Sequence, residues 1–207
     1  LVGLAVSMLC FSSSLRAQDA PAVAATTTTT TRPAVTRVAC VGDSITFGSG
    51  LKDRHTESYP SQLQAMLDAH APGKWEVQNF GVSGSTLLKK GDRPYWDQKR
   101  FAAAKAFAPD VVVVKLGTND SKPQNWKFGD EFRGDLVALV EEFRAFQSKP
   151  AVWLCRPVPA FPGAYGIRDE IIRGEILPII DDVAKELNTP VIDLYGALGG
   201  KAEHFPD

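Results

Sequence analysis

Short apolar runs alternate with segments of helical periodicity from residue 36 onward, and this alternation restricts the folds open to the chain. The clearest run is Val-Val-Val-Val-Lys-Leu at residues 111–116, and further strands are predicted near residues 37–41, 75–80, 151–155 and 190–194. Continuous apolar runs are typical of strands buried on both faces. Strands separated by helices favour a parallel sheet with helices on both sides.

The segments between the runs carry apolar side chains at helical spacing. They predict helices near residues 59–69, 97–107, 132–147 and 169–187. Three side chains of the first helix are expected to be buried: Leu63, Met66 and Leu67. Pro178 is expected to kink the last helix, because proline lacks the N–H that a helix interior needs.

The first 35 residues do not have the pattern of a folded domain. Residues 1–17 are typical of a secretory signal peptide whose start is missing, with an apolar core and a cleavage site after Ala17. An uncleaved anchor is the alternative, for which the apolar run is short. Residues 18–35 contain a run of threonines and predict a disordered linker. We therefore expect a secreted or periplasmic protein, without a membrane span after signal removal, whose single domain covers residues 36–207.

Charge and cysteine content argue against several functional classes. A formal net charge of −1 gives no electrostatic reason to expect binding to nucleic acid or to an anionic membrane. Cys40 and Cys155 lie in strand runs that should not be neighbours, so they are expected to be buried free thiols. The histidines are scattered without ligand spacing, so neither a metal nor another cofactor is expected. The glycines after the first strand also lack the spacing of a dinucleotide site.

Three predicted strands end in turns that carry groups suited to acyl transfer. The first run ends at Gly42 and is followed by Ser44, the second leads into a loop containing Gly84, and the third ends in Gly-Thr-Asn-Asp, which contains Asn119. The carboxyl ends of strands in an open α/β sheet are where ligands bind. A hydroxyl, a backbone N–H and a carboxamide at one edge are the parts of a site with a nucleophile and oxyanion donors.

These turns resemble the motif blocks of the SGNH, or GDSL-type, hydrolases. The blocks are Gly-Asp-Ser-Ile-Thr at residues 42–46, Gly84 within residues 79–86, and Gly-Thr-Asn-Asp at residues 117–120. The resemblance extends from residue 36 onward and implies a three-layer α/β/α sandwich, flavodoxin-like, with a doubly wound parallel five-stranded sheet. It also implies a serine esterase, which the signal-like N-terminus predicts to be secreted. Ser44 would be the nucleophile, and N–H groups of Ser44, Gly84 and Asn119 would stabilise the oxyanion.

The family's fourth block is Asp-x-x-His, and the sequence reaches only its first residue. Asp207 is the expected triad acid, with a surface turn residue as the alternative, and the analogy places the catalytic histidine three positions further on. On this analogy the domain is incomplete at its C-terminus, and residues 1–207 alone should have little or no esterase activity. His204 lies on the wrong side of Asp207 for the motif, and His55 is expected to be a solvated loop residue.

Each candidate also has a purely structural interpretation. Ser44 could be a helix N-cap, Gly84 a turn residue with positive φ, and Asn119 an Asx-turn residue. Gly81 is the alternative to Gly84 as an oxyanion donor. Two neighbouring carboxylates are expected to support loops rather than to take part in the chemistry: Asp43 and Asp120.

The layout is most similar to that of bacterial carbohydrate esterases that remove acetyl groups, such as sialate O-acetylesterase-like and acetylxylan esterase-like proteins. The expected partner is thus a small-molecule or carbohydrate ester. A lysophospholipase or thioesterase on the same fold, or a non-catalytic carbohydrate-binding relative, is the alternative. Four loop aromatics could stack on sugar rings or simply pack the loops: Tyr95, Trp96, Trp126 and Phe161.

Overall fold

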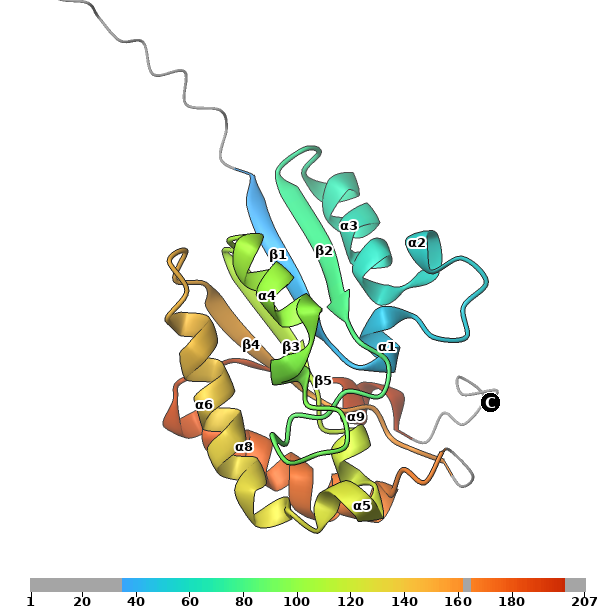
Figure 1. Cartoon of the computed structure of the whole chain (residues 1–207). Coiled ribbons are helices and arrows are strands. Elements are labelled where there is room, and N and C mark those ends of the chain that lie inside the picture. The colour runs from blue at the N-terminus through green and yellow to red at the C-terminus, as the bar shows by residue number, and fades with distance from the viewer. Residues whose placement is uncertain (1–34, 162–164, 200–207) are drawn as a thin grey trace, which may run out of the picture. The chain divides into compact units, whose positions relative to one another are not determined.

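The computed structural model describes residues 35–161 and 165–199, and its centre is one parallel sheet in the order β2-β1-β3-β4-β5 (Figure 1). The strands are β1 (Thr36–Gly42), β2 (Trp75–Gly81), β3 (Val111–Lys115), β4 (Ala151–Arg156) and β5 (Val191–Asp193). The expected five-stranded parallel α/β fold is confirmed. The proposed signal peptide, and the linker up to residue 34, lie outside the described residues.

The connections between strands contain helices of very different lengths. The α-helices are α1 (Ser44–Phe47), α2 (Arg54–Glu57), α3 (Tyr59–His70), α4 (Lys99–Ala106), α5 (Pro123–Trp126), α6 (Phe132–Arg144), α7 (Asp169–Ile171), α8 (Leu177–Glu186) and α9 (Leu194–Leu198). There are also three 3₁₀-helical turns, η1 (Tyr95–Asp97), η2 (Asn119–Ser121) and η3 (Gly129–Glu131), and one π-helical turn, η4 (Ile172–Ile176). None of the helices in these described ranges is long and apolar enough to cross a membrane.

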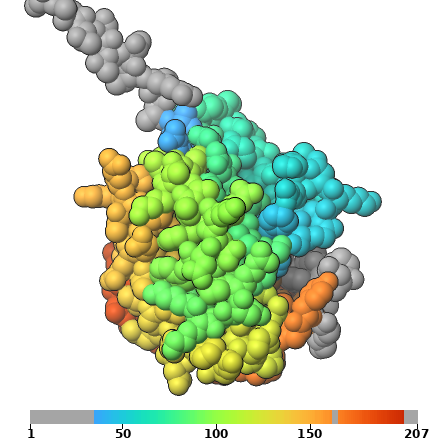
Figure 2. Space-filling view, in the orientation of Figure 1, coloured from blue at the N-terminus to red at the C-terminus, as the bar shows by residue number. Residues whose placement is uncertain are grey.

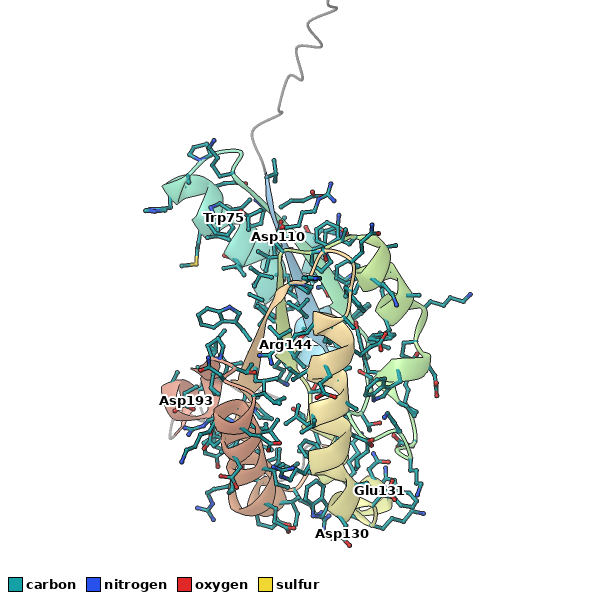
Figure 3. All side chains as sticks on the ribbon, turned by 90° about the vertical axis from the view of Figure 1, so that its left-hand side faces the viewer. Trp75, Asp110, Asp130, Glu131, Arg144 and Asp193 are labelled. Carbon is teal, nitrogen blue, oxygen red and sulfur yellow. The ribbon has the colours of Figure 1, made fainter. Side chains whose placement is uncertain are left out.

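The two faces of the sheet are covered unequally. One face packs on α4, α6 and α8 and forms a large apolar cluster that includes Val112, Leu139 and Ile180. The other face packs on α3 and α9 and forms a small cluster around Cys40 and Cys155. Figure 3 shows α3 and α4 on opposite sides of the strands, and in Figure 2 the green β2–β3 connection spreads over one surface of the domain. The described domain is therefore a layered α/β/α structure with most of its core on one side.

The two cysteines are buried free thiols, as expected, on strands separated by β3. Burial raises the pKa of each thiol to about 12. Both thiols therefore stay protonated near neutral pH.

Two local predictions were wrong. Met66 is 70% exposed, because α3 covers only part of its face of the sheet: the side chains of α3 other than that of Pro60 are half-buried or exposed. The segment after Ser44, in which His55 is expected to be a loop residue, holds α1 and α2, and His55 lies in α2. The predicted helix over residues 169–187 is confirmed, because α7, η4 and α8 follow one another without a break from Asp169 to Glu186, and Pro178 lies in the first turn of α8. The π-helical turn accommodates the proline, where a missing N–H would otherwise disturb a regular helix.

The register brings the ends of β1, β2 and β3 to the same level. Gly42, which ends β1, pairs with Gly81 of β2 on one side and with Lys115 of β3 on the other. The three turns that follow these strands are therefore neighbours at the carboxyl edge of the sheet, where open α/β folds bind ligands.

Candidate active site

Ser44 is the first residue of α1, directly after the end of β1. Asp43 is the N-cap of this helix, since its Oδ1 accepts a hydrogen bond from the N–H of Ile45 at 3.0 Å. Gly48 closes the helix in the left-handed region with φ +86°. The N-cap interpretation of Ser44 is thus wrong, and its half-buried side chain does not have a capping role.

Two hydrogen-bonding groups of Ser44 are left free by the surrounding structure. Within residues 35–161 and 165–199, no group forms a hydrogen bond with its Oγ or accepts one from its N–H. The N–H of a first helical residue has no partner inside the helix. The hydroxyl and the amide of this residue can therefore both bind a ligand.

Gly84 lies in the turn after β2 with φ +78°, which confirms the turn interpretation. In the described part of the chain, nothing accepts a hydrogen bond from its N–H. The N–H of Gly81, by contrast, donates to Oδ1 of Asn79 at 2.9 Å. The alternative donor Gly81 is therefore already occupied, and a Cβ there would overlap the backbone of Phe47.

Asn119 begins η2 and is 4% exposed. The side-chain Nδ2 of Asn119 donates to the backbone carbonyl oxygen of Ser85 at 3.0 Å. The backbone carbonyl oxygen of Asn119 accepts from Nδ2 of Asn125 at 2.9 Å. A carboxamide nitrogen carries two protons, and the bond to Ser85 uses one. The second proton remains for another acceptor.

Hydrogen bonds join the three turns to one another. The carbonyl of Gly42 accepts from the N–H of Val82 at 2.9 Å and from the hydroxyl of Ser85 at 3.3 Å. The carbonyl of Ser85 in turn holds Asn119, and the hydroxyls of Ser49 and Ser83 lie 2.5 Å apart. The turns that carry Ser44, Gly84 and Asn119 are thus fastened together, as a nucleophile with oxyanion donors requires.

Asp120 is fully buried beneath these turns. Its two carboxylate oxygens accept from the N–H groups of Leu88 at 2.8 Å and Leu87 at 3.1 Å, so it holds the β2–β3 connection in place. Burial raises the pKa of Asp120 to about 7, although the two N–H groups favour the charged form. The expected loop-supporting roles of Asp43 and Asp120 agree with these contacts.

Lys115 is a residue that the sequence analysis passed over as part of an apolar strand. It is 0% exposed, and its Nζ lies 3.1 Å from both carboxylate oxygens of Asp43. The signal was present in the sequence, because a buried lysine is rare unless it is paired. The paired carboxylate, however, comes from a turn 72 residues away.

A general base for Ser44 is not found among the described residues. His55 in α2 and His70 in α3 are both exposed, and neither is hydrogen-bonded to Ser44. Asp207 and His204 lie outside the described residues, so their predicted roles stay predictions.

The loop aromatics mainly support the loops. Tyr95 is fully buried and donates to the carbonyl of Phe80 at 2.8 Å, so it cannot form a sugar platform. Trp96 donates to the carbonyl of Leu87 at 2.9 Å. Trp126 donates to Glu175 at 3.0 Å and packs against Phe132. The side chains of Tyr95, Trp96 and Trp126 thus have structural partners. Phe161 is half-buried.

Comparison with known proteins gives consistent matches. Residues 40–207 match the model of the GDSL-like lipase/acylhydrolase family. The chain is 44% identical over 179 residues to an acetylxylan esterase of Xylanibacter ruminicola, a match that covers 78% of this chain and 36% of the relative. It is also 28% identical to the uncharacterized lipoprotein YqeF of Bacillus subtilis, with 80% of this chain and 74% of the relative covered.

Among solved structures, a carbohydrate acetylesterase family member from Sinorhizobium meliloti superimposes with a TM-score of 0.58 at 22% identity. That match covers 77% of this chain and 83% of the other. It agrees with the α/β fold described above. The chain spans little more than a third of the length of its acetylxylan esterase relative.

Proposed function

Because the chain belongs to the GDSL-like lipase/acylhydrolase family, we propose that it is an exported serine esterase that removes acetyl groups from carbohydrates. The observation that carries this proposal is the arrangement around Ser44. Among the described residues, the unbonded hydroxyl of Ser44 lies on a turn that is hydrogen-bonded to the turn after β2, and that turn is hydrogen-bonded to the side chain of Asn119 after β3. The turn after β2 carries the unbonded N–H of Gly84, and Asn119 has a second amide proton.

In the proposed reaction, Oγ of Ser44 attacks the ester carbonyl and forms a tetrahedral intermediate. The N–H groups of Ser44, Gly84 and Asn119 stabilise its negative oxygen. A histidine oriented by Asp207 takes the proton from Ser44; when the intermediate collapses, the bond between the carbonyl carbon and the sugar oxygen breaks, and the histidine passes the proton to that oxygen. Water then attacks the carbonyl of the acyl-enzyme while the histidine takes one of its protons; the bond to Oγ of Ser44 breaks, Oγ receives the proton, and acetate is released.

The choice of substrate follows from similarity to the acetylxylan esterase of X. ruminicola. An acetyl ester has the smallest common acyl group and needs no long apolar groove. A lysophospholipase or thioesterase would need one. We therefore propose acetylated polysaccharides or oligosaccharides as the substrate class.

The proposal is tested with the native protein that contains this chain, assayed on acetylated xylan and on p-nitrophenyl acetate. Ser44→Ala is expected to lower kcat by about 10³-fold or more, and Asn119→Ala by about 10²–10³-fold. Ser148→Ala serves as the control, with activity close to that of the parent, because Ser148 precedes β4 at the opposite edge of the sheet and its hydroxyl has no hydrogen bond to the described residues.

The choice of ester separates the alternatives. Faster turnover of p-nitrophenyl acetate than of octanoate or palmitate supports the acetylesterase, whereas the reverse order favours a lysophospholipase or thioesterase. If Ser44→Ala leaves turnover unchanged, the serine esterase proposal fails. Sugar binding without turnover by the parent would point to the non-catalytic relative.

Export is proposed from the apolar run at residues 1–17 and the threonine-rich segment after it. The similarity to a Bacillus subtilis protein that is named a lipoprotein also supports export from the cytoplasm. Fractionation of the producing cell tests this. Recovery of the mature protein outside the cytoplasm is expected, and an unprocessed protein in the cytoplasm would contradict it.

A further inference from the structure

Lys115 ends β3 as a charged residue inside an otherwise apolar strand. Its ammonium is completely enclosed, and Asp43, its partner, is also 0% exposed. All three donors of the ammonium are used, two by the Asp43 carboxylate at 3.1 Å and one by Oγ1 of Thr118 at 2.8 Å. A fully buried ion pair needs hydrogen-bond partners for all of its donors, because removing both charges from water costs free energy.

The partners of Lys115 are the residues next to the candidate catalytic groups. Asp43 precedes Ser44 and caps α1 through the N–H of Ile45. Thr118 precedes Asn119, whose side chain holds the turn of Gly84 through the carbonyl of Ser85. One ammonium group therefore connects the nucleophile turn after β1 to the oxyanion turn after β3.

We propose that Lys115 is a positioning residue that fixes the distance and orientation between Ser44 and Asn119, acting through Asp43 and Thr118. The inference rests on the proposed esterase function. Lys115 does not touch the reacting atoms, since each of its N–H groups is already bonded within the protein. Its effect is on the alignment of the groups that do touch them.

The rate of acyl transfer is sensitive to the distance between the nucleophile and the oxyanion donors. A shift of about 1 Å between a nucleophile and its oxyanion donors can lower the rate by about 10²-fold without weakening substrate binding in proportion. Loss of the clamp should therefore lower kcat more than it raises KM.

The first test compares Lys115→Met with the parent in the native protein, using p-nitrophenyl acetate. Methionine keeps the length of the side chain and removes its charge. We expect kcat to fall by about 10–10²-fold while KM changes by less than about threefold. A folded Lys115→Met variant that retains kcat within about threefold of the parent would overturn the proposal.

A double substitution tests the route through Asp43. In the Lys115→Met background, Asp43→Asn should lower kcat much less than it does in the parent, because the two residues act as a unit. Fully additive losses would overturn the proposed route. Lys89→Met is the control, because Lys89 also pairs with a carboxylate, that of Asp135, but at a different place in the fold.

If Lys115→Met does not fold, the Thr118 contact provides a milder test. Thr118→Val keeps the shape of the side chain and removes the hydroxyl that accepts from Lys115, whereas Thr118→Ser keeps that hydroxyl. We expect the valine variant to lose kcat by about fivefold or more and the serine variant to restore it. Equal activity of the two variants would overturn the proposal.

Hydrogen–deuterium exchange distinguishes a failure of this inference from a failure of the proposed function. In Lys115→Met or Thr118→Val, amides in residues 43–48 and 117–121 should exchange about tenfold faster or more, with little change in α6. Faster exchange in these turns supports the clamp even if no ester is hydrolysed, in which case only the esterase proposal fails. Unchanged exchange there would overturn the clamp even in an active esterase.

Discussion

At the scale of single residues, buried polar side chains organise the site. Asp43, Lys115 and Asp120 are all 0% exposed and are all paired or hydrogen-bonded. Each one holds a turn by contacts to the backbone or to another turn. The chemistry proposed for Ser44 therefore depends on buried polar side chains that do not contact the substrate.

Asp120 gives a prediction about pH. Burial raises the pKa of Asp120 from its ordinary value, about 4, to about 7, so between about pH 4 and pH 7 the folded protein holds a proton that the unfolded chain has lost. The free energy of unfolding should therefore decrease as the pH rises through this window, by an amount on the order of a few kcal/mol, and this contribution should level off above about pH 7.

Urea unfolding of the parent and of Asp120→Asn from pH 4 to pH 8 measures this effect. The stability advantage of the parent over the variant should be largest near pH 4 and shrink toward neutral pH. Asp130→Asn, at an exposed aspartate, controls for the loss of one negative charge. Parallel curves for the parent and Asp120→Asn would contradict the prediction.

At the scale of elements, the short helix α1 has to sit directly on β2. A Cβ at Gly81 would overlap the backbone of Phe47, and Nδ2 of Asn79 donates to the carbonyl of Thr46 at 2.7 Å. Two backbones that approach this closely leave no room for adjustment. The position of the Ser44 turn is thus set by packing against a neighbouring strand as well as by its own sequence.

Two glycine substitutions compare the stability cost of a steric clash between backbones with the cost of a positive φ angle. Gly81→Ala is expected to cost about 3 kcal/mol or more in the free energy of unfolding, because backbone atoms must move apart. Gly84→Ala is expected to cost about 1–2 kcal/mol, because φ is positive but the space is open apart from Arg93.

Thermal or urea unfolding of the two variants checks this order. Gly134→Ala is the matched control, because Gly134 lies in α6 with open space around its Cα, and alanine should stabilise the helix there by about 0.5–1 kcal/mol. A Gly81→Ala variant as stable as Gly84→Ala would show that α1 can shift away from β2.

At the scale of the whole described domain, the two sides of the sheet carry unequal amounts of core. The cluster under α4, α6 and α8 contains most of the fully buried side chains, including Leu139. The cluster under α3 contains four buried residues and has half-buried neighbours such as Leu63. Most of the hydrophobic stabilisation should therefore come from the first side.

This asymmetry predicts different costs for the same change. Leu139→Ala should lower the free energy of unfolding by about 2–5 kcal/mol, because it leaves a cavity in a closed core. Leu63→Ala should cost less than about 2 kcal/mol, because part of that side chain is already in water. Urea unfolding of both variants measures the difference, and equal losses would show that the two clusters contribute alike.

Local pattern predicted the strands well, because each buried run ends at a glycine, proline or polar turn. Strands β1, β2 and β3 lie within about a residue or two of their predicted ends. It failed where a helix is short or where a neighbour decides burial. Helix α1 depends on the Asp43 cap and on contact with β2, and Met66 is exposed because α3 covers only part of its face of the sheet.

The sequence alone determined the alternation of strands and helices, the parallel sheet and the three motif turns, because periodicity and turn residues are local properties. Only the tertiary structure decided which hydrogen-bond donors stay unbonded among the described residues. The N–H of Gly81 donates to Asn79, whereas the N–H of Gly84 has no acceptor there. The side chain of Asn119 donates to Ser85. The tertiary structure also brought Lys115 against Asp43 across 72 positions of sequence. The physical reason is that burial and hydrogen bonding are properties of neighbours in space, and the register of β1 with β2 and β3 chooses those neighbours.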